Sequence, residues 1–131
     1  MNKDEQNKIP VLVSVASEQE PLTVEGELTQ NLDGFALEFK LGGDSFTVLH
    51  AEKATQIKAD GVMAYDITLS DEKTSTLLAT PYGKIRFDVI TVERRVTSTN
   101  DGFKILLAYE LNNDAAGKIA RAVDVTVHKN I

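Results

Sequence analysis

The feature that most constrains this chain is a long, alternating apolar stretch between Leu77 and Leu111 that turns back on itself. It contains two strand-like runs separated by Asn100-Asp101-Gly102. Asp-Gly between two alternating runs predicts a tight hairpin, because both turn positions need φ > 0 and glycine adopts that without steric cost. A hairpin with arms this long is not stable alone in water, so we expect other strands to cover its apolar face.

Period-two alternation continues through most of the chain, and no segment has apolar residues spaced by three and four over a helical length. Further turn signals are at Asn31 to Gly34, Gly42 to Asp44, Asp60-Gly61 and Asn112 to Gly117. About ten short strands with closely spaced turns are typical of an all-β sandwich or barrel. Consecutive hairpins favour an up-and-down meander, and closure would remove its two exposed edges.

We therefore predict an all-β fold, a single closed or nearly closed antiparallel meander barrel of about 8–10 strands. At 131 residues the chain is long enough for one domain with a real core. We assign the barrel to residues 9–131 and a flexible N-terminal tail to residues 1–8.

The first strand of the long hairpin changes its apolar parity midway. The apolar residues are Ile85, Phe87 and Val89 before the change, and Ile90, Val92 and Val96 after it. Because a slip of one residue sends side chains to the opposite face of a sheet, we predict a bulge or sharp bend near Val89-Ile90-Thr91.

Composition excludes several classes of function. The chain has no cysteine, which excludes disulfides and thiolate chemistry, and it has a net charge of -6 without a basic run, which argues against nucleic-acid or anionic-membrane partners. The first residues lack an apolar signal core, and no run approaches the ~20 apolar residues of a membrane span. We predict a soluble cytoplasmic protein. The sequence gives no motif for a cofactor.

Three stretches resemble a known family. Thr80-Pro81-Tyr82-Gly83 with the following KIRFDVITVE, the strand DGFKILLAYEL at 101–111, and LDGFALEF at 32–39 are similar to the YwiB-type uncharacterised β-barrel family of bacteria. The resemblance covers most of the chain and implies a calycin-like, lipocalin-like closed barrel. It implies no activity, because the family is a domain of unknown function. The chain has no tryptophan, so the Gly-x-Trp signature of lipocalins is absent.

Catalytic and metal motifs are weak. His50 and His128 are the two histidines, and they are far apart in a chain without cysteine, so we predict no metal site. Gly43-Asp44-Ser45 is similar to the Gly-Asp-Ser of one esterase family, but that nucleophile needs a strand-to-helix turn in an α/β sheet. A simple turn is the better interpretation. We therefore predict that the chain is not an enzyme.

Strand register provides the best candidate site. With Asp101-Gly102 as a two-residue turn, Tyr109 would pair with Arg94, and closure of the next hairpin would pair it with Arg121. All three share the apolar parity, so they should point inward near one end of the barrel. Two guanidinium groups and a tyrosine hydroxyl could bind a carboxylate or phosphate, as in the similar Arg and Tyr site of intracellular fatty-acid carriers. Alternatively, the arginines stack on the tyrosine and extend to solvent at the rim.

Two classes of function follow from these patterns. The first is a non-enzymatic carrier or sensor that holds a small, partly apolar anion inside the barrel through Arg94, Tyr109 and Arg121. The second is a solid-core module that binds a protein partner through its surface, as a monomer or homodimer. The first requires a cavity on the order of 300 Å³ or more beside the arginines, and the second requires none.

Overall fold

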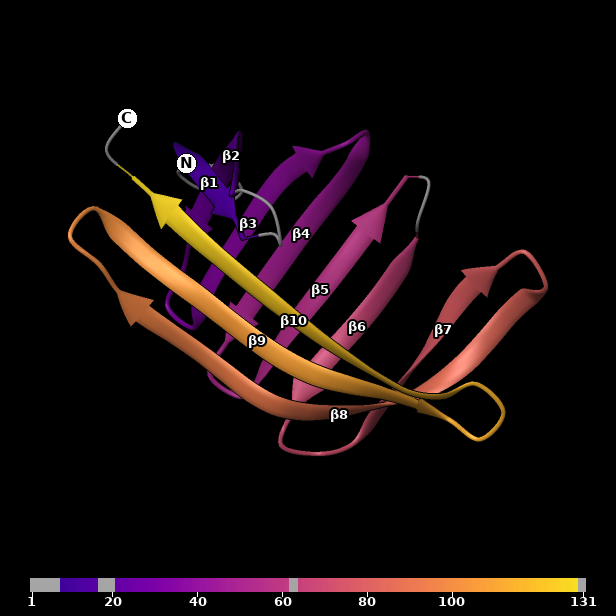
Figure 1. Ribbon diagram of the computed structural model, residues 1–131. Helices are drawn as coiled ribbons and strands as arrows, with labels where there is room; N and C mark the ends of the chain where they lie inside the picture. The colour runs from indigo at the N-terminus through magenta and orange to yellow at the C-terminus, as the bar shows by residue number, and fades with distance from the viewer. Residues whose placement is uncertain (1–7, 17–20, 62–63, 130–131) are drawn as a thin grey trace, which may run out of the picture.

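The computed structural model describes residues 8–16, 21–61 and 64–129, in which ten antiparallel strands form a nearly closed barrel without a helix (Figure 1). The strands are β1 Lys8–Val15, β2 Leu22–Gln30, β3 Gly34–Leu41, β4 Asp44–Ala51, β5 Ala54–Asp60, β6 Tyr65–Ser70, β7 Thr74–Thr80, β8 Gly83–Ser98, β9 Gly102–Asn113 and β10 Gly117–His128. This confirms the predicted fold class. The predicted tail lies outside the described residues, except that Lys8 is already the first residue of β1.

The barrel is a meander in which nearly all neighbours in the chain are neighbours in the sheet. The strand order is β6-β5-β4-β3-β2-β1-β10-β9-β8-β7. The first and last strands pair through rungs such as Leu12 with His128 and Val15 with Val125. The two ends of the sheet are therefore β6 and β7, which are consecutive in the chain.

The seam between β6 and β7 is bridged by threonine side chains. Thr74 Oγ1 donates to the carbonyl oxygen of Thr68 at 2.6 Å, and Thr76 Oγ1 donates to that of Asp66 at 2.7 Å. No ladder between β6 and β7 is found among the described residues, and β7 diverges from β6 beyond the connecting loop (Figure 1). The barrel is therefore closed by strand pairing on every side but one.

Strand β8 serves both halves of the barrel. Residues 83–89 pair with β7, and residues 88–98 pair with β9. The register shifts between Thr91 and Glu93, which leaves Val92 as the bulged residue, just beyond the predicted range. Phe87 and Val89 are buried before the bulge, whereas Ile90 and Val92 are exposed on the outer side. The parity change in the sequence thus predicted the bulge but not the exposure of these two side chains.

The turn between β8 and β9 differs from the prediction. The amide of Thr99 donates to the carbonyl oxygen of Gly102 at 3.0 Å and Ser98 pairs with Phe103, so Asn100-Asp101 forms the turn. Gly102 begins β9 and is not among the glycines with positive φ. A Cβ at Gly102 would lie 1.8 Å from the carbonyl oxygen of Val127. The glycine is therefore required by the close approach of β10 and not by the turn.

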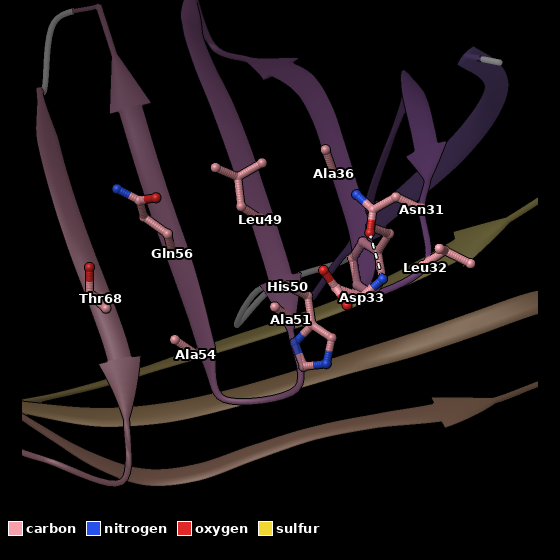
Figure 2. A pocket seen from close by; sticks show the side chains of 11 residues that line it. Asn31, Leu32, Asp33, Ala36, Leu49, His50, Ala51, Ala54, Gln56 and Thr68 are labelled. Atoms are coloured by element: carbon pink, nitrogen blue, oxygen red, sulfur yellow. Dashed lines mark hydrogen bonds between the residues drawn. The ribbon is translucent and has the colours of Figure 1, made fainter. Parts of the chain in front are cut away.

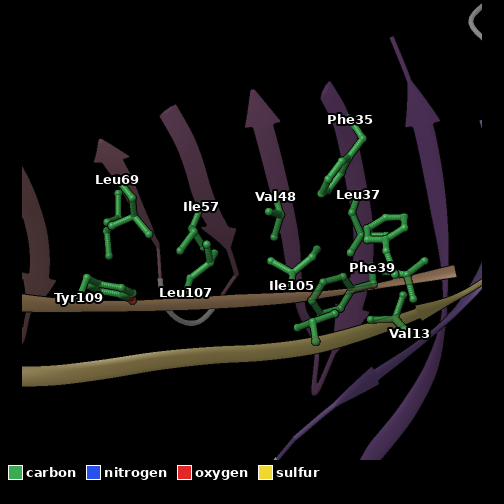
Figure 3. Packing of buried hydrophobic residues seen from close by; sticks show 14 of the residues in the cluster. Val13, Phe35, Leu37, Phe39, Val48, Ile57, Leu69, Ile105, Leu107 and Tyr109 are labelled. Atoms are coloured by element: carbon green, nitrogen blue, oxygen red, sulfur yellow. The ribbon is translucent and has the colours of Figure 1, made fainter. Parts of the chain in front are cut away.

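Side chains from strands on opposite sides of the barrel fill its interior. Val48 on β4 and Ile57 on β5 face Ile105 and Leu107 on β9 (Figure 3). All four have exposed fractions of 3% or less. Apolar side chains packed in this way exclude water and contribute most of the free energy that stabilises a domain of this size.

Candidate functional site

The three predicted site residues occupy two rungs of the sheet. Tyr109 pairs with Arg121 across β9 and β10, as predicted. The predicted pairing of Tyr109 with Arg94 is wrong, because Tyr109 pairs with Thr91 and Arg94 pairs with Leu107. The error follows directly from the displaced hairpin turn and from the bulge. The structure thus brings Arg121 to Tyr109 and places Arg94 one inward rung away.

Arg94 is used to hold the turn between β4 and β5. Its Nη1 donates to the carbonyl oxygen of Ala51 at 2.9 Å and to Thr55 Oγ1 at 3.3 Å, and its Nη2 donates to the carbonyl oxygen of Glu52 at 2.6 Å. The planar fork of a guanidinium suits two neighbouring carbonyl groups. We name Arg94, Thr55 and the 51–52 turn the Arg94 latch, because these contacts join β8 to the opposite layer.

The latch extends to His50. Thr55 is fully buried, and its Oγ1 lies 2.8 Å from His50 Nδ1. Because Arg94 can only donate, Thr55 accepts from it, and the hydroxyl proton is available to a neutral His50. Burial, with the charge of Arg94 as a second cause, lowers the pKa of His50. The His50 ring also stacks on Phe35, with centroids 5.2 Å apart.

Tyr109 and Arg121 form a second group together with Tyr65 on β6. Burial raises the pKa of Tyr109 to about 12, with Tyr65 adding to the rise and Arg121 opposing it. Burial also raises the pKa of Tyr65, and the Arg121 charge again opposes the rise. One guanidinium therefore acts on two tyrosine hydroxyls contributed by different layers of the barrel. We name these three residues the Tyr-Arg cluster.

The polar atoms of the Tyr-Arg cluster have no hydrogen-bond partner within the described parts of the chain. Tyr109 is only 5% exposed, and buried tyrosine hydroxyls usually have a partner. The enclosed side-chain atom without a partner is Asn112 Oδ1, so the Tyr109 hydroxyl is not sealed from solvent. The cluster thus offers three donor groups at a position that solvent can reach.

The inner wall of the barrel is open beside this cluster. On β10 the inward row runs from Ile119 through Arg121 and Val123 to Val125 and Val127. The first three side chains are partly or fully exposed, whereas Val125 and Val127 are buried. The inward side chains of the first half of β10 are therefore less covered than those of its second half. Accessible side chains of the inner wall are therefore both apolar and cationic here.

The concavities of the described residues lie elsewhere. One, of about 630 Å³, runs over the outer side of β3 to β6 and contains His50, Asp33 and Leu49 (Figure 2). Another, of about 690 Å³, adjoins it on the outer side of the seam and shares Gln56 and Thr68. Both are open, and neither is lined by a predicted site residue. The interior cavity that an enclosed ligand requires is not among them.

Metal chemistry finds no support in the described segments, which contain no group of three His, Asp or Glu side chains suited to a metal ion. His128 Nδ1 lies 3.0 Å from Asp101 Oδ2, so the second histidine anchors the β8–β9 turn. Within the described residues, no helix is long and apolar enough to cross a membrane.

Tyr65 is the member of the cluster that the sequence did not reveal. It lies 44 residues before Tyr109, and its strand ends a sheet in which β6 and β9 are not neighbours. Only the closure of the barrel brings the two hydroxyls near one guanidinium. No local pattern in the sequence could have indicated that proximity.

The comparisons with known proteins show a likeness of fold. The crystal structure of the ywiB protein from Bacillus subtilis matches with a TM-score of 0.63 and 11% sequence identity, over 95% of this chain and 91% of that chain. No protein-family model and no curated protein sequence matches. The resemblance predicted from the sequence is thereby confirmed: this chain is an all-β barrel similar in fold to YwiB.

Proposed function

We propose that the chain is a non-enzymatic cytoplasmic protein that binds a small, partly apolar anion at the open part of the inner wall, as a carrier or sensor. The observation that carries the proposal is the Tyr109 hydroxyl. It belongs to a side chain that is 5% exposed, makes no hydrogen bond with any described residue, and lies within the field of Arg121. Water can reach this hydroxyl in the free protein, and an anion held by Arg121 would replace that water as its hydrogen-bond partner.

The chemistry of the cluster fits an anionic head group. A guanidinium and two tyrosine hydroxyls are donors, and together they match the oxygens of a carboxylate or phosphate. Ile119 and Val123 flank Arg121 on the same inward row and offer apolar contact to the rest of the ligand. Because the interior beyond Val125 is packed, the ligand would rest at the open end and not deep inside the barrel.

Arg94 takes a different place in this proposal from the one predicted. As a direct ligand contact it remains a prediction, but both of its terminal nitrogens already donate to protein oxygens. A ligand at Arg94 would have to replace those hydrogen bonds, whereas a ligand at Arg121 would replace none with the described residues.

The test is a thermal-shift measurement against a panel of fatty acids and phosphorylated metabolites. A ligand at about 100 times its dissociation constant stabilises the native state by about 2.7 kcal/mol. We expect this shift in the wild type and its loss in Arg121→Gln and Tyr109→Phe. Arg86→Gln, at an exposed position on β8, is the matched control and should keep it. Absence of any shift in the wild type, or equal shifts in all variants, would contradict the proposal.

A second candidate function is a solid-core interaction module, and one observation favours it. The concavities of about 630 and 690 Å³ open to the outside of the barrel, and neither is lined by a residue of the Tyr-Arg cluster. Amide chemical shifts distinguish the two functions. If no anion in the panel perturbs the amides of residues 107–111 and 119–123, the interior site is refuted and the surface becomes the place to look for a partner.

A further inference from the structure

The outer side of β8, β9 and β10 carries a group of apolar side chains, interrupted by Glu93 beside Ala108 and by Glu110 between Ile90 and Ala120. Its members face outward on three adjacent strands: Ile90, Val92, Leu106, Ala108, Ala120 and Ala122. Ile90 is 37% exposed and Val92 is 63% exposed, and Ala120 and Ala122 are also exposed. We name this surface the outer β8–β10 face. Exposed apolar surfaces with a polar rim commonly mark sites of protein interaction.

The rim of this face carries opposite charges at opposite ends of the same rungs. Leu106 on β9 has Arg95 as its partner on β8 and Asp124 as its partner on β10. At the other end of the face, Asn112 has Asp88 on β8 and Lys118 on β10. On each of these two rungs, the residue on β8 and the residue on β10 therefore carry opposite charges.

We propose that the outer β8–β10 face binds a second copy of this chain, with a two-fold axis along β9. Such an axis sets Arg95 of each copy opposite Asp124 of the other, and Asp88 opposite Lys118, while the apolar centres meet. Arg95 and Asp88 already make ion pairs with Glu93 and Lys73 of their own copy, so the second copy adds a further opposite charge to each. A two-fold interface must be self-complementary in this way. The exposed alanines of β10 permit close approach of the exposed Ile90 of the second copy.

The distribution of charge along the chain favours the outer β8–β10 face over the other surfaces as the dimer interface. Residues 1–66 have 12 acidic and 5 basic side chains, whereas residues 67–131 have 8 acidic and 9 basic ones. Two copies that met through β1 to β6 would bring like charges together. Lys104 and Glu110 lie on the proposed axis, but they have Asp124 and Lys118 at 3.6 and 3.7 Å as opposite charges. Each of these two side chains would therefore meet the same side chain of the second copy with its charge already balanced by an ion pair.

The test is sedimentation equilibrium of the full chain, with two charge-reversal variants. Arg95→Asp places two acidic groups opposite each other in its homodimer, and Asp124→Arg places two basic groups opposite each other. We expect each variant alone to dimerise about tenfold more weakly than the wild type. An equimolar mixture of the two should regain dimers, because both contacts of the mixed dimer are attractive again.

Lys58→Asp is the control, because Lys58 lies on the outer side of β5, away from the face. It should leave the dimer unchanged. Val92→Lys at the bulge should weaken it without affecting folding, which circular dichroism checks. A wild type that remains monomeric at about 100 μM, or a mixture of the two charge-reversal variants no more dimeric than either alone, overturns the proposal. Neither result bears on the Tyr-Arg cluster, which lies on the inner wall.

Discussion

Removing the guanidinium of Arg94 should destabilise the barrel far more than removing that of its neighbour Arg95. Arg94 makes three hydrogen bonds to the β4–β5 region, at 2.6, 2.9 and 3.3 Å. Arg95 is exposed and makes an ion pair with Glu93. The two residues are adjacent on β8, have the same side chain and differ in the contacts that their guanidinium groups make. They therefore form a matched pair for mutation.

The magnitude follows from the kind of hydrogen bond. A hydrogen bond from a charged donor contributes about 1.5–3 kcal/mol when buried and less when solvent competes. Arg94 is half-buried, so we expect Arg94→Ala to lower the free energy of unfolding by about 2–3 kcal/mol. Arg94→Lys keeps the charge but lacks the planar fork that reaches both carbonyl groups, so we expect about half that loss. Arg95→Ala should cost about 0.5 kcal/mol, as exposed ion pairs do.

Urea unfolding followed by far-ultraviolet circular dichroism measures these differences. For a domain of this length, the Arg94→Ala loss corresponds to a decrease of the melting temperature of about 6–12 °C. A loss for Arg94→Ala no larger than that for Arg95→Ala would refute the latch. It would mean that the turn at Ala51 and Glu52 is held by its own strands and that the guanidinium contacts add nothing measurable.

Three further predictions test other parts of the structure. Because the pKa of His50 is lower in the folded chain, the unfolded chain binds more protons at acid pH. The contribution of neutral His50 to the free energy of unfolding is therefore present above about pH 6.5 and is lost as the pH falls below it. Urea unfolding at pH 7.5 and 5.0 should show that the free energy of unfolding decreases less in His50→Gln than in the wild type between these two pH values. Gly26→Ala places a Cβ 2.7 Å from the carbonyl oxygen of Glu38 and 2.9 Å from Val13 Cγ2, so thermal melting should show a loss of about 1–3 kcal/mol, and an unchanged melting temperature would contradict it. Tyr109, with its pKa raised to about 12, should give a late tyrosinate absorbance step that disappears in Tyr109→Phe; a titration curve unaltered by that substitution would count against burial of the ring.

Alternation predicted the ten-strand meander because side chains in a half-buried sheet must change sides at every residue. The same rule predicted an irregularity in β8, because its apolar parity changes between Val89 and Ile90; the structure places the bulge at Val92, just beyond the predicted range. Register within β9 and β10 was also predictable, because the turn residues between them leave one pairing that buries both apolar rows. These features depend on neighbours in the chain.

The rest depends on contacts that the chain makes at a distance. Gly102 reads as a turn residue, but β10 passes so close to it that no Cβ fits, and the turn lies one residue earlier. That displacement separated Arg94 from Tyr109 in the pairing. The contacts of Arg94 with the β4–β5 turn, and the electrostatic effect of Arg121 on Tyr65, arise only when the barrel closes. The periodicity of apolar residues does not indicate which strands face each other once the barrel has closed.

The place of the seam has a consequence for the order in which the chain is connected. Since β1 pairs with β10 and no ladder joins β6 to β7, the first and last described strands are interior strands of the sheet, whereas its two edge strands are consecutive in the middle of the chain. A circular permutant that links residue 129 to residue 8 and opens at 71–73 would have ten strands in strictly sequential order. It would replace the most distant pairing in the chain with a local one, and chains with lower contact order fold faster.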